Sequence, residues 1–135
     1  MNIDLYKVYI SPLIPCNGEV GIDPEKGYKS ITTPRMLMPG EICTDSYILI
    51  GCYSTFEEAE MFSEFMMLKL PRYLLRITYS SMHVGWQNFR YVPKLPLDKK
   101  WTDKELYELY GLTDTEMRIV EKTMRTITKN TPDDE

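Results

Sequence analysis

Apolar and polar residues alternate near the start of the chain, in the pattern of a strand with one buried face. Residues 5–10 follow this alternation and end at a Ser-Pro pair, which predicts a short strand. Residues 11–45 are rich in proline and glycine, so we expect a long excursion there, with short strand pieces such as residues 30–33. Branched and aromatic residues dominate residues 46–53, which predicts a buried strand.

A helical period replaces this alternation after residue 54. Thr55 and Glu58 form a capping box, and apolar residues follow at helical spacing. These apolar residues are Phe56, Ala59, Phe62, Phe65 and Met66. Pro71 is expected to end or kink the helix near Leu70, after which a second helical piece continues to about Ile77.

The last third of the chain predicts one more strand and two short helices. Residues 89–92 form the strand, which a proline closes. Two capping boxes begin the helices, and a glycine suits the helix end between them. These residues are Thr102 with Glu105, Gly111, and Thr113 with Glu116. Met117, Val120 and Met124 give the last helix an apolar face.

The elements together predict a single domain, residues 1–128, followed by a disordered tail, residues 129–135. The expected fold class is α/β (α+β): a small mixed sheet flanked by helices, with two short C-terminal helices. A chain of 135 residues buries about two-thirds of its unfolded surface, so neither a disulfide nor a metal is needed to hold it together.

Charge is unevenly distributed along the chain, which carries a net charge of −4. Residues 1–60 hold nine acids and four bases, residues 61–100 hold two acids and seven bases, and residues 101–135 hold nine acids and five bases. The middle segment is therefore +5 between acidic flanks. Lysine and arginine neutralise phosphate in nucleic-acid binding, but a chance run of solvated cations on one helix and its loop also explains the pattern.

The cysteine and histidine content argues against metal sites and common catalytic groups. Cys16, Cys43 and Cys52 are odd in number and far apart, so we expect them to be reduced, with Cys52 packed in a strand. His83 is the sole histidine, which leaves little material for a metal site or a Ser-His-Asp triad. No apolar run is long enough to span a membrane and no secretory signal is evident, so the expected location is the cytoplasm.

No catalytic motif accompanies these features. The chain has neither an Asn-Pro-Pro-Tyr-like loop for holding an extruded adenine nor a glycine-rich turn for a methyl donor. The nearest nuclease-like segment, residues 23–26 (DPEK), lies in a Pro/Gly-rich loop without a hydrophobic strand around it. We therefore expect a domain that is not an enzyme and binds no cofactor.

A surface for nucleic-acid recognition is the remaining candidate site. Three bases at helical spacing are expected to contact phosphate: Lys69, Arg72 and Arg76. A second group offers side chains for bases or grooves, namely His83, Trp86, Gln87 and Arg90, with Lys94 as a further phosphate contact. An alternative stays open: Trp86 and Phe89 belong to the core, and Gln87 and Asn88 only form a turn.

Several segments, in order, resemble a known family. They are residues 7–11 (KVYIS), 39–47 (PGEICTDSY), 54–60 (STFEEAE), 91–93 (YVP) and 101–103 (WTD), the last followed by the YGLTDTE of residues 110–116. This set resembles the C-terminal end of bacterial adenine-specific restriction-modification DNA methyltransferases of type II and type III-like systems. The resemblance extends from about Tyr6 to Met124. Two departures are Pro71, which interrupts a helix that the family keeps continuous, and residues 78–81 (TYSS), where the family commonly has a polar triplet.

The resemblance implies a target-recognition region that binds double-stranded DNA and does not itself catalyse. A methylase cannot reach a stacked base, so the domain would position the duplex for a methyltransferase or nuclease domain in the same or another chain. The chain is then either an excised domain or a stand-alone recognition subunit. The Trp101 segment has a structural explanation, in which Trp101 packs the first short helix and the two threonines cap helices.

Two other functions are compatible with the sequence. One is a protein-interaction module that docks on a restriction-modification subunit through the acidic first and last thirds of the chain. The other is an anti-restriction decoy derived from the domain. DNA binding that weakens steeply with salt would distinguish target recognition from both.

Overall fold

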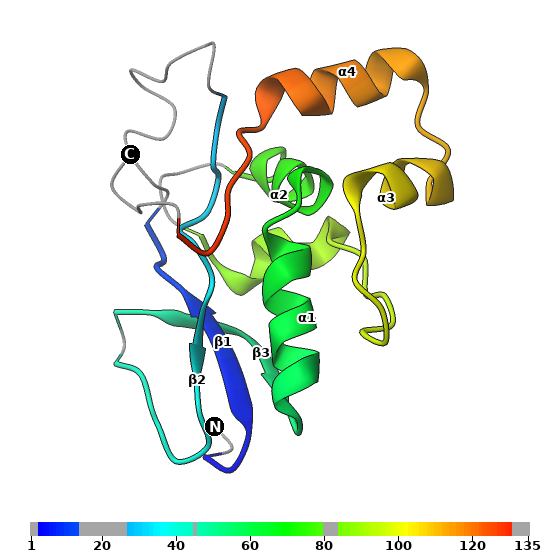
Figure 1. The fold of residues 1–135 in the computed structure, drawn as a ribbon. Coiled ribbons are helices and arrows are strands. Elements are labelled where there is room, and N and C mark those ends of the chain that lie inside the picture. Colours follow the sequence, from blue (N-terminus) through cyan, green and yellow to red (C-terminus); the bar gives the residue numbers. More distant parts are fainter. Residues whose placement is uncertain (1–2, 14–26, 45, 80–83, 131–135) are drawn as a thin grey trace.

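The computed structural model describes residues 3–13, 27–44, 46–79 and 84–130. Figure 1 shows its elements, which are β1 (Tyr6–Ile10), β2 (Arg35–Leu37), β3 (Ile48–Tyr53), α1 (Phe56–Met66), α2 (Lys69–Arg76), the 3-10 helix η1 (Trp86–Tyr91), α3 (Asp103–Leu109) and α4 (Asp114–Thr123). The expected α+β class is confirmed. Cys16, the DPEK segment, His83 and residues 131–135 of the expected tail lie outside the described residues.

The three strands form one sheet in the order β2-β1-β3. Both pairs are antiparallel, with Tyr6 opposite Tyr53 and Ile10 opposite Ile48, so this sheet is antiparallel rather than mixed. Helix α1 runs along the sheet (Figure 1). Gly51 permits this close packing, because a Cβ atom there would lie 2.9 Å from the Phe62 ring.

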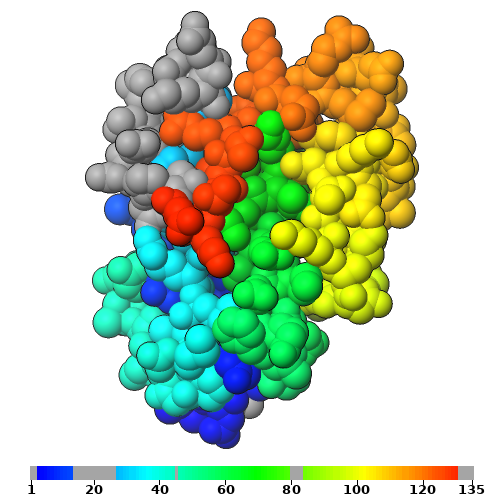
Figure 2. Space-filling model, viewed as in Figure 1, coloured from blue at the N-terminus to red at the C-terminus, as the bar shows by residue number. Residues whose placement is uncertain are grey.

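The chain after β3 forms the helical half of the molecule, from α1 to α4. In Figure 2, the green helices α1 and α2 lie between the blue and cyan N-terminal half and the yellow and orange C-terminal helices. Residues from both halves share one core, which includes Ile10, Ile31, Met66, Leu75, Leu106 and Met124. The chain beyond α4 returns to the N-terminal half, where Arg125 N–H donates to Tyr28 O at 2.8 Å. Among the described residues, no helix is both long enough and apolar enough to cross a membrane.

The boundary between α1 and α2 differs from the expected position. Helix α1 ends at Met66, and α2 begins at Lys69 instead of breaking near Leu70. Pro71 falls in the first turn of α2, where its missing N–H would have no partner within the helix. The amides of Lys69 and Leu70 donate instead to the Asp103 carboxylate, at 3.0 and 2.9 Å. Asp103 thus caps α2 from another element.

Three other local predictions were wrong. Residues 30–33 are buried but do not form a strand. The strand in this part of the chain is β2, at residues 35–37. Residues expected to form a strand at 89–92 belong mostly to η1. Cys52 is exposed rather than packed, because β3 lies at the edge of the sheet and its alternate side chains face away from the core.

The predicted ends of the C-terminal helices are confirmed. Thr102 and Thr113 accept hydrogen bonds from the N–H groups of Glu105 and Glu116, and each glutamate completes its capping box. Gly111 separates the helices with a φ of 64°, in the left-handed region that favours glycine. Trp101 packs against the core and donates its indole N–H to Pro96 O at 2.8 Å, as its structural explanation requires.

The two capping glutamates, Glu105 and Glu116, should make the free energy of unfolding fall as the solution becomes acidic. A hydrogen bond from Lys99 and then those from Thr102 lower the pKa of Glu105, and hydrogen bonds from Thr113 lower the pKa of Glu116. Their contribution to stability is therefore complete above the ordinary pKa of 4.5 and is lost as the pH falls through the folded-state values. We expect the urea midpoint to fall on acidification. The double variant Glu105→Gln, Glu116→Gln should show a shallower fall, and identical pH profiles would contradict this assignment.

Candidate functional site

Arg72 lies in the centre of the molecule. It has no exposed surface, and burial lowers the pKa of its guanidinium to about 10, with Asp103 partly opposing the shift. Its nitrogens donate to four main-chain carbonyls at good distances: Met67 O at 3.1 Å, Leu68 O at 3.0 Å, Lys29 O at 3.1 Å and Arg125 O at 2.6 Å. The prediction that Arg72 contacts phosphate was therefore wrong, because its donors are used inside the core.

The other two cations of the expected stripe also have partners within the molecule. Lys69 Nζ lies 2.8 Å from a carboxylate oxygen of Glu121, and the Lys69 side chain is only 19% exposed. The Arg76 guanidinium lies over the Tyr28 ring, 3.3 Å from its centroid. The helical spacing does place these bases on one side of α2, but that side faces α4 and the segment around Tyr28. They do not form an open phosphate-binding surface.

Helix η1 presents the second group of predicted residues. Trp86 is 85% exposed, and Gln87 and Arg90 are exposed beside it. The Arg90 guanidinium lies 5.2 Å from the ring centroid of Tyr91, which is also exposed. Phe89 packs against the core instead. The alternative interpretation is thus correct for Phe89 and wrong for Trp86.

Asn88 fixes η1 against the end of α2. Its Oδ1 accepts from Gly85 N–H at 2.8 Å, and its Nδ2 donates to Thr78 O at 3.1 Å and Thr78 Oγ1 at 2.9 Å. The Thr78 hydroxyl in turn donates to Leu75 O at 2.6 Å. Because Asn88 is buried, these bonds are shielded from water. The exposed side chains of η1 therefore project from a fixed backbone.

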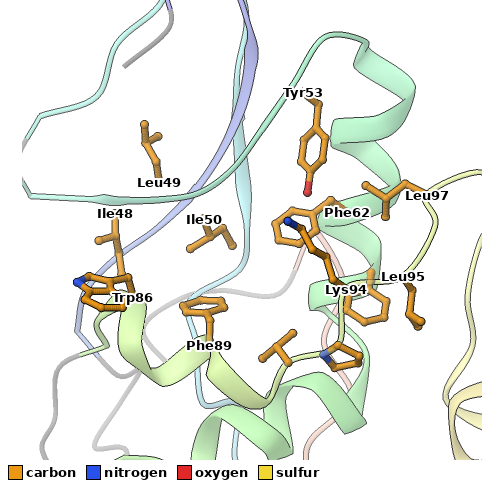
Figure 3. A pocket seen from close by; sticks show the side chains of 13 residues that line it. Ile48, Leu49, Ile50, Tyr53, Phe62, Trp86, Phe89, Lys94, Leu95 and Leu97 are labelled. Atoms are coloured by element: carbon orange, nitrogen blue, oxygen red, sulfur yellow. The ribbon is translucent and has the colours of Figure 1, made fainter.

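An apolar pocket of about 420 Å³ lies beside η1. Figure 3 shows that it is walled by residues from three parts of the chain. Strand β3 supplies residues such as Ile48 and Ile50, α1 supplies Phe62 and Phe65, and the segment from Trp86 to Leu97 closes the remaining side. No sequence pattern indicates this pocket, because its walls are separated by up to 49 residues, the difference between positions 48 and 97.

Two polar side chains, Tyr53 and Lys94, line the pocket, and Figure 3 draws both beside Phe62. Burial, together with the nearby Cys52 and Glu58, raises the pKa of Tyr53 to about 12. Lys94 is exposed and forms no ion pair with any described residue. Its expected contact with phosphate stays a prediction, and its place in the pocket lining also lets it meet an anionic group that enters the pocket.

The neighbouring lysines are paired. Lys99 forms an ion pair with Glu105 and lies 4.5 Å from the Trp101 ring centroid. Lys100 lies 3.8 Å from a carboxylate oxygen of Glu64. Within the described parts of the chain, no three histidine, cysteine or acidic residues gather in a way that could hold a metal ion. Arg90 and Lys94 also lie near the pocket, and neither forms an ion pair with a carboxylate in the described parts of the chain.

The candidate site consists of an exposed polar and aromatic face on η1 and an apolar pocket next to it. Its side chains offer hydrogen bonding, stacking, one cation at the rim and an apolar cavity, which are the properties of a binding surface. Comparison of the chain with protein-family models, with curated proteins and with solved structures finds no match.

Proposed function

We propose that the chain is a non-catalytic domain that recognises double-stranded DNA for a restriction-modification adenine methyltransferase, and that η1 carries the contacts. The observation that carries this proposal is the exposure of Trp86, Gln87 and Arg90, all three on the short helix η1. The resemblance of the ordered segments to the C-terminal end of adenine methyltransferases supplies the expected partner, a catalytic domain in the same or another chain.

The chemistry of this face suits base edges in a groove. Arginine pairs with guanine through two hydrogen bonds, glutamine pairs with adenine in the same way, and an exposed indole offers a face for apolar or stacking contact. Gln87 and Arg90 provide these donors and acceptors, and Trp86 provides the ring. His83, which lies outside the described residues, stays a predicted contact.

The charge of the surrounding segment supports contact with phosphate. Residues 65–97 contain five lysines and arginines and no acidic residue. Three of these bases are used within the fold, which leaves Arg90 and Lys94 for DNA. We therefore assign the phosphate contact to Lys94 and withdraw it from Arg72.

Two substitutions separate sequence recognition from general affinity. Lys94→Ala should weaken binding to all duplexes alike and reduce the slope of log affinity against log salt by about 1. Gln87→Ala should cost about 1–3 kcal/mol on the preferred sequence and little on others. The measurement is fluorescence anisotropy with pooled random duplexes at low and moderate salt, followed by sequencing of the bound fraction.

Lys104→Ala on the exposed surface of α3 is the matched control and should leave both quantities unchanged. If Gln87→Ala lowered the affinity equally for every DNA sequence, Gln87 would not be a base contact. Absence of salt-dependent binding by the unaltered domain would contradict the proposed function itself.

A further inference from the structure

The two outer strands of the sheet differ in how they are protected from pairing. β2 has three residues, one of them an exposed arginine, and Pro34 precedes it. Charge, proline and short length are the usual devices that stop an edge strand from adding another chain. β3 has six residues, ILIGCY, with neither a charge nor a proline. The β3 edge has none of these devices.

The outer side of β3 has open backbone groups. β3 pairs with β1 on one side, and no described residue hydrogen-bonds to its backbone on the other side. A strand edge of this kind offers alternating N–H and C=O groups to an extended peptide. None of the six residues is fully buried, and Cys52 is exposed.

The apolar pocket opens along the same strand. Ile48 and Ile50 point from β3 into the pocket, facing Trp86 and Phe89 (Figure 3). A volume of about 420 Å³ falls within the range of sites that hold ligands. A peptide lying along β3 would thus find a cavity for its large apolar side chains, with Lys94 in the lining of that cavity.

We propose that β3 accepts an extended segment of a partner protein as an additional strand, with large apolar side chains of that segment in the pocket and a carboxylate beside Lys94. A second copy of this chain paired through β3 fits less well, because β3 carries no carboxylate for Lys94. A small molecule in the pocket would leave the backbone edge of β3 open. The inference goes beyond DNA recognition and does not depend on it.

The 135-residue chain is used to select binders from a displayed library of random twelve-residue peptides. We expect enriched sequences with aromatic or large aliphatic residues at alternate positions and an acidic residue nearby. Synthetic copies of an enriched peptide should lose about tenfold or more in affinity when alternate backbone nitrogens are methylated, and little when the intervening ones are. A peptide held only by side chains would show no such alternation, and that result would overturn the proposal.

A charge exchange tests the role of Lys94. Lys94→Glu should weaken the acidic peptide about tenfold, and replacing the peptide's acid by lysine should restore its affinity for this variant. Lys104→Ala, on the exposed surface of α3 and outside the pocket lining, is the matched control and should leave peptide binding unchanged. Failure to enrich any peptide would overturn the proposal. A free chain that is a dimer, and that dissociates when Leu49→Lys is introduced, would also overturn it, because a second copy would then occupy β3.

Discussion

Replacing Arg72 by methionine is expected to lower the free energy of unfolding by about 3–5 kcal/mol. Methionine preserves much of the length of the side chain but cannot donate hydrogen bonds. The carbonyls of Met67, Leu68, Lys29 and Arg125 would lose their charged donor inside the core, where water cannot easily replace it. Urea denaturation followed by circular dichroism measures the loss.

The matched control is Arg118→Met on the exposed surface of α4, which should change stability by less than about 0.5 kcal/mol. Arg72→Lys should still be destabilising, because a single ammonium cannot span carbonyls in three segments. A variant Arg72→Met that unfolds like the unaltered chain but loses DNA affinity would show that the guanidinium acts at the surface. It would restore the original prediction for this residue.

Arg72 also shows what periodicity can and cannot predict. The spacing of Lys69, Arg72 and Arg76 correctly indicates that the three share one side of a helix. Spacing does not say what packs against that side. Here residues 28–29 and 125 approach it from distant parts of the chain, and their carbonyls supply the partners that make burial of a cation tolerable.

The predictions that succeeded depend on local interactions. The N-terminal caps of α1, α3 and α4 each use a threonine and the residue three positions later, so a few neighbouring residues contain the signal. The strands β1 and β3 also follow from local composition, but the prediction that β3 is buried was wrong, because β3 is an edge strand with no buried residue. The extra strand predicted at residues 89–92 failed because Asn88 binds Gly85 and Thr78, which curls the backbone into η1.

The candidate site needs long-range contacts, which explains why only part of it could be predicted. The exposed residues of η1 were identified from their type, since polar and aromatic side chains occur together there. The pocket was missed, because its residues on β3 and α1 are typical of an ordinary core. Lys94 joins the two parts: it was singled out as a cation, and the fold places it at an apolar cavity.

Asn88 gives the second large effect, because both proposed binding surfaces depend on the position of η1. Asn88→Ala should lower the free energy of unfolding by about 3 kcal/mol, since Gly85 N–H and Thr78 O would lose their partner at a buried position. The exposed face of η1 and one wall of the pocket would then lose their fixed backbone. DNA affinity and peptide affinity should fall together, although Asn88 itself is buried and contacts neither ligand.

Hydrogen exchange at the η1 amides tests this explanation separately from global stability. In Asn88→Ala, exchange at residues 86–91 should accelerate more than exchange in α1, whereas Arg72→Met should accelerate both alike. Asn88→Asp provides an intermediate case, because it keeps the acceptor for Gly85 N–H and loses the donor to Thr78. If Asn88→Ala destabilised the whole molecule evenly and left both affinities unchanged, η1 would be only a structural element, and the binding face would have to lie elsewhere on the molecule.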